Sequence, residues 1–213
     1  MKFFLKLIIS FLFFYSLTAF SGTDISQDQY RILFLGDSLT EGYGIDEDKT
    51  YVSLLEKKWE SEGRNIQVFN GSVSGSTTSS AMSRLRWFER VSPTHLVLAL
   101  GANDGLRGLS VQSTQKNLEE AIEWALSRDI TVVLAGMLMP PNYGREYTEE
   151  FEKMFSNLAK KHAVYFIPFL LEGVAAEEKY NLPDGIHPNE KGHELMKKNV
   201  QKFLNPLLGI TTE

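Results

Sequence analysis

Short apolar runs alternate with segments of helical spacing along most of the chain, and this alternation constrains the fold more than any other feature. A strand buried on both faces is a continuous apolar run, whereas an amphipathic helix has apolar residues three or four positions apart. The strand candidates are residues 31–35, 66–69, 95–100, 130–135 and 164–167, and the helix candidates are 51–62, 76–90, 111–128, 148–162 and 190–204. Strands that alternate with helices pair in parallel through right-handed crossovers. The sequence therefore predicts a three-layer α/β/α sandwich.

Polar and glycine-rich segments follow several of these strands. In an open parallel sheet, ligands bind in the crevice at the carboxyl ends of the strands. Residues 36–39, 70–75 and 101–105 follow the first three strand candidates, and residues 184–188 lie between the fifth strand and the last helix. We therefore expect these four segments to meet at one edge of the sheet and to form the functional site.

Three side chains in these segments have the chemistry of nucleophilic catalysis. A serine hydroxyl needs a base to take its proton, and histidine suits that role because it titrates near neutral pH. The imidazole in turn needs a carboxylate that orients it. We predict Ser38 as the nucleophile, His187 as the base and Asp184 as the acid. Asp184 and His187 are three positions apart, which lets one short segment present both side chains.

Acyl transfer also needs hydrogen-bond donors for a developing oxyanion. The candidate donors are the backbone N–H groups of Ser38 and Gly75 and the side-chain amide of Asn103. Two nearby acidic residues have structural interpretations instead. Asp37 is expected to order the turn or cap the following helix, and Asp104 is expected to form hydrogen bonds within its loop.

The four segments resemble, in order and spacing, the blocks that define the SGNH (GDSL) hydrolase superfamily. They read GDSL at residues 36–39, SG at 74–75, GAND at 101–104 and DGIHP at 184–188. The resemblance spans the chain beyond its first twenty or so residues. It implies hydrolysis without a metal or cofactor, and a flavodoxin-like sheet of five parallel strands in the order 2-1-3-4-5.

Residues 101–108 (GANDGLRG) and 140–144 (PPNYG) indicate one subgroup within this superfamily. They are similar to a bacterial subgroup of periplasmic multifunctional thioesterases, lysophospholipases and arylesterases, in which the loops after the third and fourth strands border the acyl pocket. The resemblance implies that the residues in contact with substrate are Leu106, Leu109, Met137, Pro140 and Tyr143. The chain departs from a member of the subgroup at Ser76, where that member has an acidic residue. This difference concerns substrate preference rather than the chemistry.

The N-terminus has the pattern of a targeting segment. Lys2 and Lys6 precede and flank an apolar run over residues 7–17, and the small residues Ala19 and Ser21 follow it. This pattern predicts a cleaved signal peptide over residues 1–21 and one hydrolase domain over residues 22–213, located in the periplasm or secreted. An uncleaved membrane anchor is the alternative. Lipoprotein processing is not supported, because position 22 is glycine rather than cysteine.

Composition excludes several other functions. The formal net charge of −5 argues against a nucleic-acid or anionic-membrane partner held by charge, and the absence of cysteine excludes a disulfide framework and a thiolate metal site. We expect no metal, because His187 and His193 lack the spacing of two ligands on one helical face. His95 and His162 are expected to be structural or surface residues. We expect a monomer that acts on a small-molecule or lipid acyl ester.

The sequence leaves two other functions open. One is an acetyl esterase that acts on cell-envelope carbohydrate, for which a broad open site would be the indication. The other is a non-catalytic envelope-binding module that has kept the fold. The presence of every residue that the chemistry requires disfavours the second alternative.

Overall fold

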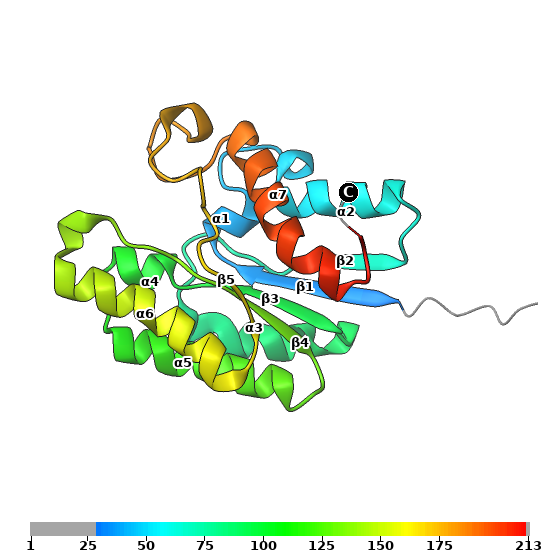
Figure 1. The fold of residues 1–213 in the computed structure, drawn as a ribbon, viewed down its shortest axis with the longest axis horizontal. Coiled ribbons are helices and arrows are strands. Elements are labelled where there is room, and N and C mark those ends of the chain that lie inside the picture. Colours follow the sequence, from blue (N-terminus) through cyan, green and yellow to red (C-terminus); the bar gives the residue numbers. More distant parts are fainter. Residues whose placement is uncertain (1–28, 212–213) are drawn as a thin grey trace, which may run out of the picture.

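The structure, a computed structural model, describes residues 29–211 and contains a five-stranded parallel sheet (Figure 1). The strands lie in the order β2-β1-β3-β4-β5, as the family resemblance implied. Their bounds are β1 Tyr30–Gly36, β2 Ile66–Asn70, β3 His95–Ala99, β4 Thr131–Ala135 and β5 Tyr165–Ile167. All five strand candidates are thus confirmed, with ends that differ by no more than two residues from those expected.

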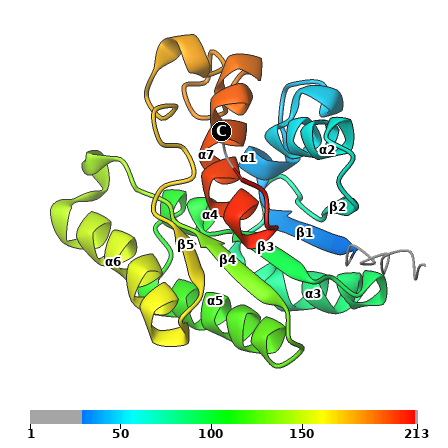
Figure 2. The same ribbon diagram turned by 45° about the vertical axis from the view of Figure 1, so that its right-hand side comes forward.

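Helices cover both faces of the sheet, which confirms the three-layer α/β/α sandwich. In Figures 1 and 2, α2 and α7 lie on one face, and α3, α5 and α6 lie on the other. The longer helices are α2 Tyr51–Ser61, α3 Ala81–Phe88, α5 Val111–Leu126, α6 Arg145–His162 and α7 Glu190–Leu207. Single turns of 3₁₀ helix occupy Glu47–Lys49, Thr78–Ser80, Glu89–Val91, Pro141–Tyr143 and Glu178–Tyr180.

The register places β1 between β2 and β3. Leu33 of β1 lies opposite Phe69 of β2 on one side and opposite Leu96 of β3 on the other. The side chains of β1 from Ile32 onward and all five residues of β3 are buried, as expected for strands with helices on both faces. This arrangement fixes the carboxyl ends of β1 and β3 side by side.

Two short helices were not expected from the sequence, and both follow central strands. Helix α1 spans Ser38–Glu41 and helix α4 spans Ala102–Leu106. Segments of four or five residues are too short to show a helical period, so the sequence pattern could not reveal them. Both begin at the carboxyl edge of the sheet, where the predicted site lies.

Several helix ends also differ from the expected ones. Helix α3 begins at Ala81 rather than near residue 76, because the preceding residues form a 3₁₀ turn that is held by a hydrogen bond from the Thr78 amide to Asp104. Helix α6 begins at Arg145, three residues before the expected start. The turn before it ends at Gly144, whose φ of 87° favours glycine. Helix α7 continues through Pro206 to Leu207.

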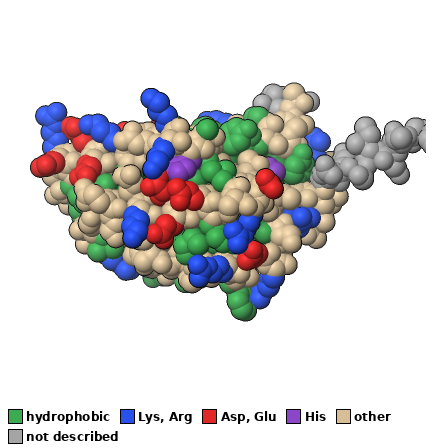
Figure 3. All heavy atoms as spheres, turned by 90° about the horizontal axis from the view of Figure 1, so that it is seen from below, with side chains coloured by type: hydrophobic (Ala, Val, Ile, Leu, Met, Phe, Trp, Pro, Cys, Tyr) green, Lys and Arg blue, Asp and Glu red, His purple; other side chains and the backbone are tan. Residues whose placement is uncertain are grey.

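Among residues 29–211, no helix combines the length and the apolar character that a bilayer crossing requires. The predicted signal peptide over residues 1–21 lies outside the described residues. The face seen in Figure 3 carries acidic and basic side chains side by side, with no extended area of a single sign.

Candidate active site

The loop from β1 into α1 places Ser38 at the start of a helix. The side chain of Asp37 caps α1 by accepting a hydrogen bond from the Leu39 amide at 3.1 Å, as the sequence predicted. Gly36 allows a close approach, because a Cβ at this position would lie 2.5 Å from Oγ1 of Thr40. The strand therefore ends in a tight turn that presents Ser38 at the carboxyl edge of the sheet.

The segment before α7 folds around the carboxylate of Asp184. Its Oδ1 accepts hydrogen bonds from the amides of Ile186 (2.9 Å) and His187 (3.0 Å), and Gly185 has a φ of 70° in this turn. Its Oδ2 lies 2.7 Å from Nδ1 of His187. The hydrogen bonds from the backbone and side chain of His187, with that from Ile186, lower the pKa of Asp184 to about 2. The carboxylate therefore stays ionised throughout the physiological pH range.

The structure brings this segment to Ser38 across nearly the whole chain. Nε2 of His187 lies 3.0 Å from Oγ of Ser38, so a continuous hydrogen-bonded chain runs from the hydroxyl through the imidazole to Asp184. The ring of Tyr43 lies 4.5 Å from the ring of His187, measured between centroids. Sequence reasoning missed Tyr43, since nothing in its local pattern distinguishes it from a surface residue. The two rings are tilted by 41° to each other, and a contact this close restricts how far the imidazole can turn.

The three predicted oxyanion donors all lie in loops or short helices at the carboxyl edge. Ser38 begins α1, Asn103 lies in the first turn of α4, and Gly75 has a φ of 76° in the loop after β2. Among the described residues, the Gly75 amide has no hydrogen-bond acceptor, which leaves it available to a ligand. Its carbonyl oxygen accepts a hydrogen bond from Arg107 at 3.0 Å, and this bond helps to hold the loop.

Two buried carboxyl groups lie beneath the site and have different surroundings. Asp104 accepts hydrogen bonds from the amide (2.9 Å) and hydroxyl (2.6 Å) of Thr78, so its role is structural as expected, but its partner lies in the turn before α3 rather than in its own loop. Asp37 is 1% exposed, and its Oδ2 has no hydrogen-bond partner among the described residues. Burial raises the pKa of Asp37 to about 6, although the Leu39 amide and the Asn103 side chain oppose this shift.

An apolar hollow of about 380 Å³ adjoins these residues. Leu39, Ala102 and Ile186 in its wall are close neighbours, along the chain, of Ser38, Asn103 and His187. The other residues that line the hollow are Leu106, Met137, Leu138, Met139, Pro140, Pro141, Phe169, Leu171, Ala175, Ala176 and Gly185.

The predicted substrate-contact residues divide into two groups. Leu106, Met137 and Pro140 line the hollow, whereas Leu109 and Tyr143 do not. The Tyr143 hydroxyl instead donates to the Leu106 carbonyl at 2.8 Å, and the Leu109 carbonyl accepts from Tyr147 at 2.9 Å. These two residues therefore help to hold the end of α4 and the loop that follows it, next to Leu106 in the wall. Sequence reasoning missed the segment after β5, which closes the far side and has no motif of its own.

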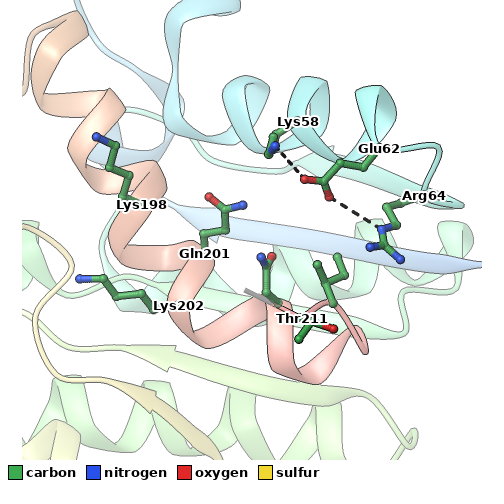
Figure 4. A pocket seen from close by; sticks show the side chains of 9 residues that line it. Lys58, Glu62, Arg64, Lys198, Gln201, Lys202 and Thr211 are labelled. Atoms are coloured by element: carbon green, nitrogen blue, oxygen red, sulfur yellow. Dashed lines mark ion pairs between the residues drawn. The ribbon is translucent and has the colours of Figure 1, made fainter. Parts of the chain in front are cut away.

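A second hollow, of about 480 Å³, lies near the amino ends of the strands, between the ends of α2 and α7 (Figure 4). Glu62 lies there in ion pairs with Lys58 (2.8 Å) and Arg64 (3.7 Å). Gln201 points toward these groups, whereas the ammonium end of Lys198 points away from Glu62. This hollow is lined mostly by charged and polar side chains and shares no residue with the candidate active site.

One group of residues has the donor types of a metal site. Ligand atoms of Glu119, Glu123 and His162 lie within 4.8 Å of one another. However, Oε1 of Glu119 already lies 2.6 Å from Lys161 and 2.6 Å from His162, so its charge is paired. Buried His95 packs edge-on against the ring of Tyr30. We assign no ligand role to these residues.

Comparisons with known proteins agree with this geometry. The model of the GDSL-like Lipase/Acylhydrolase family matches residues 34–195. Esterase TesA of Pseudomonas aeruginosa is 35% identical over 83% of this chain and 89% of its own length. An arylesterase of Vibrio mimicus is 35% identical over 92% and 96% of the two chains. Thioesterase 1/protease 1/lysophospholipase L1 of Escherichia coli is 34% identical over 83% and 84%.

Solved structures give the same result. The crystal structure of TesA superposes with a TM-score of 0.80, with 35% identity over 83% of this chain and 99% of that one. An esterase EstA from Pseudoalteromonas sp., inhibited by monoethylphosphonate, has a TM-score of 0.80 and 32% identity over 84% and 98%. The chain therefore belongs to the GDSL-like lipase/acylhydrolase family, and it is a carboxylic ester hydrolase.

Proposed function

We propose that the protein is an exported serine esterase that cleaves acyl esters, and by the same chemistry acyl thioesters or lysophospholipids. The observation that carries the proposal is the hydrogen-bonded chain from Ser38 to His187 (3.0 Å) and on to Asp184 (2.7 Å). A hydroxyl, an imidazole and a carboxylate in this order form the arrangement that activates a serine nucleophile.

The mechanism follows from the positions of these groups. Oγ of Ser38 attacks the acyl carbonyl while Nε2 of His187 takes its proton, and Asp184 stabilises the imidazolium that forms. The N–H groups of Ser38 and Gly75 and the amide of Asn103 donate to the oxyanion. His187 then gives the proton to the leaving alcohol or thiol. Water repeats the cycle on the acyl-enzyme, releases the carboxylic acid and restores Ser38.

The apolar hollow supports acyl chains longer than acetyl. Its wall is almost wholly hydrophobic. The hollow has a volume of about 380 Å³, most of which an acetyl group would leave empty. Burial of each additional methylene contributes about 0.8 kcal/mol to binding. An acetyl esterase acting on carbohydrate would instead need polar groups to contact sugar hydroxyls. The names of the relatives, which include an arylesterase and a thioesterase/lysophospholipase, agree with substrates that carry an apolar acyl or aryl group.

The export proposal depends on the composition of the first twenty-one residues. Residues 1–21 would be a signal peptide, and residues 22–213 would fold as one domain that acts as a monomer in the periplasm or outside the cell. Mass spectrometry of the protein from the cell envelope and the medium tests this proposal. A mature N-terminus near residue 22 supports it, and an intact leader would instead indicate a membrane anchor.

Replacement of the nucleophile tests the function. With p-nitrophenyl esters from acetyl to dodecanoyl, we expect Ser38→Ala to lower kcat by about 10⁴-fold or more, with an unchanged thermal unfolding midpoint. Ser61→Ala, in the exposed last turn of α2, is the matched control and should keep full activity. Wild-type activity that peaks at medium chain lengths supports the acyl pocket. Activity on acetyl esters alone would favour the carbohydrate esterase, and no turnover would favour a binding module.

A further inference from the structure

The guanidinium of Arg84 lies beside the candidate oxyanion loop, and among the described residues it has no carboxylate within ion-pair distance. Arg84 is partly buried on α3, and its Nη1 donates to Oγ of Ser76 at 2.8 Å. It forms no ion pair with any described residue. The nearest carboxylate that affects it is Glu41, whose Oε2 already accepts a hydrogen bond from the amide of Ser74 at 2.8 Å. A partly buried cation that is bonded only to a neutral hydroxyl retains most of its capacity to bind an anion.

A second arginine approaches the same loop from another element. Nη2 of Arg107, which follows α4, donates to the carbonyl oxygen of Gly75 at 3.0 Å. Two guanidinium groups therefore contact the consecutive residues Gly75 and Ser76, and Gly75 carries a candidate oxyanion donor. In a protein with a formal net charge of −5, both of these cations lie beside the loop that carries Gly75.

A hollow beside Arg84 provides space for a ligand. It has a volume of about 330 Å³ and lies between the loop after β2 and helix α3. Trp87 and Val73 line it and are 59% and 50% exposed, which is unusual for large apolar side chains. Ser72 also lines it, and its buried hydroxyl has no hydrogen-bond partner among the described residues. Arg84 thus borders an open hollow that exposed apolar side chains also line, whereas the Ser72 hydroxyl is buried within the hollow's wall.

This hollow is distinct from the apolar one. The acyl hollow is lined by residues after β3, β4 and β5, whereas the hollow at Arg84 is lined by the loop after β2 and by α3, with no residue in common. A bound ester has two parts, the acyl group and the alcohol, and each needs space of its own. With the acyl chain in the apolar hollow, the second hollow is available to the alcohol.

We propose that Arg84, with Arg107, binds a phosphate group carried by the leaving alcohol, and so makes the enzyme prefer esters with an anionic alcohol part. This inference rests on the proposed esterase function and extends it to the other side of the scissile bond. The phosphate can belong to a glycerophosphate headgroup or to a phosphorylated thiol carrier. Arg84 is a specificity-determining residue in this scheme and takes no part in proton transfer.

The test compares substrates that share one acyl chain. The three substrates are a neutral 1-monoacylglycerol, the corresponding lysophosphatidic acid and the corresponding acyl-coenzyme A. We expect the wild type to favour the two phosphorylated substrates in kcat/KM over the neutral one. Arg84→Gln should lower the ratio of phosphorylated to neutral kcat/KM by about 10-fold, which is the effect of one lost charge-assisted hydrogen bond. Because the readout is a ratio of kcat/KM values, a loss of activity that is the same for both substrates cancels.

Three further variants separate specific binding from a structural effect. Arg86→Gln removes the same charge from an exposed position on the same helix and should leave the ratio unchanged. Arg84→Lys should keep part of the preference. Ser76→Asp places a carboxylate against Arg84 and should abolish the preference even though the arginine is retained. Added salt should lower the wild-type ratio, because it screens the attraction between charges.

Each outcome has a definite meaning. A wild type that hydrolyses neither these three substrates nor the p-nitrophenyl esters overturns the proposed function itself, whereas activity on the p-nitrophenyl esters alone overturns the phosphate site. A wild type that hydrolyses all three with a ratio near one, or a ratio that Arg84→Gln and Ser76→Asp both leave unchanged, overturns the phosphate site and leaves the esterase intact. A preference for lysophosphatidic acid alone identifies the glycerophosphate source. A preference for the coenzyme A thioester alone identifies the thiol carrier only if Arg84→Gln removes it, because a thiol is a better leaving group than an alcohol and raises the rate without any phosphate contact.

Discussion

At the scale of single residues, the candidate site consists of groups that the backbone holds in place before substrate arrives. The amides of Ile186 and His187 fix one oxygen of Asp184, and the other oxygen fixes the imidazole of His187. Donors that are already oriented need little reorganisation as charge develops, and this is the main source of their catalytic effect. The side chain of Asn103 lies close to buried Asp37, so its orientation also depends on a neighbour.

The contribution of Asn103 can be measured directly. We expect Asn103→Ala to lower kcat by about 100- to 1000-fold with little change in KM, because the amide donates to the oxyanion and hardly to the ground state. Asn157→Ala is a suitable control, since this asparagine is exposed on α6. A kcat within threefold of the wild-type value for Asn103→Ala would remove this residue from the oxyanion hole.

At the scale of elements, the start of α7 positions the segment that contains the acid and the base. The side chain of Asn189 caps the helix, and its backbone N–H donates to the Tyr180 carbonyl at 2.9 Å. The backbone N–H of Leu182 donates to the His187 carbonyl at 2.7 Å. Gly192 in the first turn of α7 permits this packing. A Cβ there would lie 2.3 Å from the Tyr180 carbonyl oxygen, a distance that the backbone cannot accommodate without moving.

Gly192→Ala should therefore impair catalysis at a distance from the reacting atoms. We expect kcat to fall by about 10-fold or more and the free energy of unfolding to drop by about 1–3 kcal/mol, because the helix start and the loop before it must separate. Lys191→Ala, exposed at the adjacent position, controls for alanine in this turn. Unchanged kcat together with unchanged stability would show that the loop tolerates the shift, and that the helix start does not position His187.

At the scale of the whole molecule, two buried titratable groups give the stability opposite dependences on pH. Burial lowers the pKa of His193, which accepts a hydrogen bond from the Tyr51 amide, from 6.5 to about 4. As the pH falls, the unfolded chain therefore binds this proton before the folded chain does. The contribution of His193 to the free energy of unfolding is complete above pH 6.5 and is lost as the pH falls through 4. Burial raises the pKa of Asp37 from 3.8 to about 6, so its contribution is full below pH 3.8 and is lost as the pH rises through 6.

The two effects largely offset one another in the wild type, and variants separate them. Relative to wild type, Asp37→Asn should gain up to about 3 kcal/mol of unfolding free energy at pH 7.5, and this gain should vanish near pH 3.5. His193→Gln should gain unfolding free energy relative to wild type at low pH instead, by up to about 3 kcal/mol as the pH falls from 7 to below 4, because only the wild type has the buried imidazole that resists protonation. Urea unfolding across this pH range measures both. A difference that stays constant with pH for either variant would contradict the assigned shift.

Much of this architecture follows from the sequence alone. Continuous apolar runs such as 95–100 can be buried on both faces only in a parallel sheet, and parallel strands place all their carboxyl ends at one edge. Ser38, Asn103 and Asp184 follow from their positions after strands and from the chemistry of their side chains. Local sequence also contains the information for the Asp184–His187 turn, because the hydrogen bonds that form it lie within four residues.

Only the tertiary structure determined the contacts between distant segments. Three features depend on elements that meet through space. They are the ring contact of Tyr43 with His187, the division of Leu106 and Leu109 between pocket wall and loop support, and the hydrogen bond from Arg84 to Ser76. A sequence pattern records the period and polarity of one segment at a time. It cannot show which side chain of another segment fills a given space, because close packing of the whole core determines that.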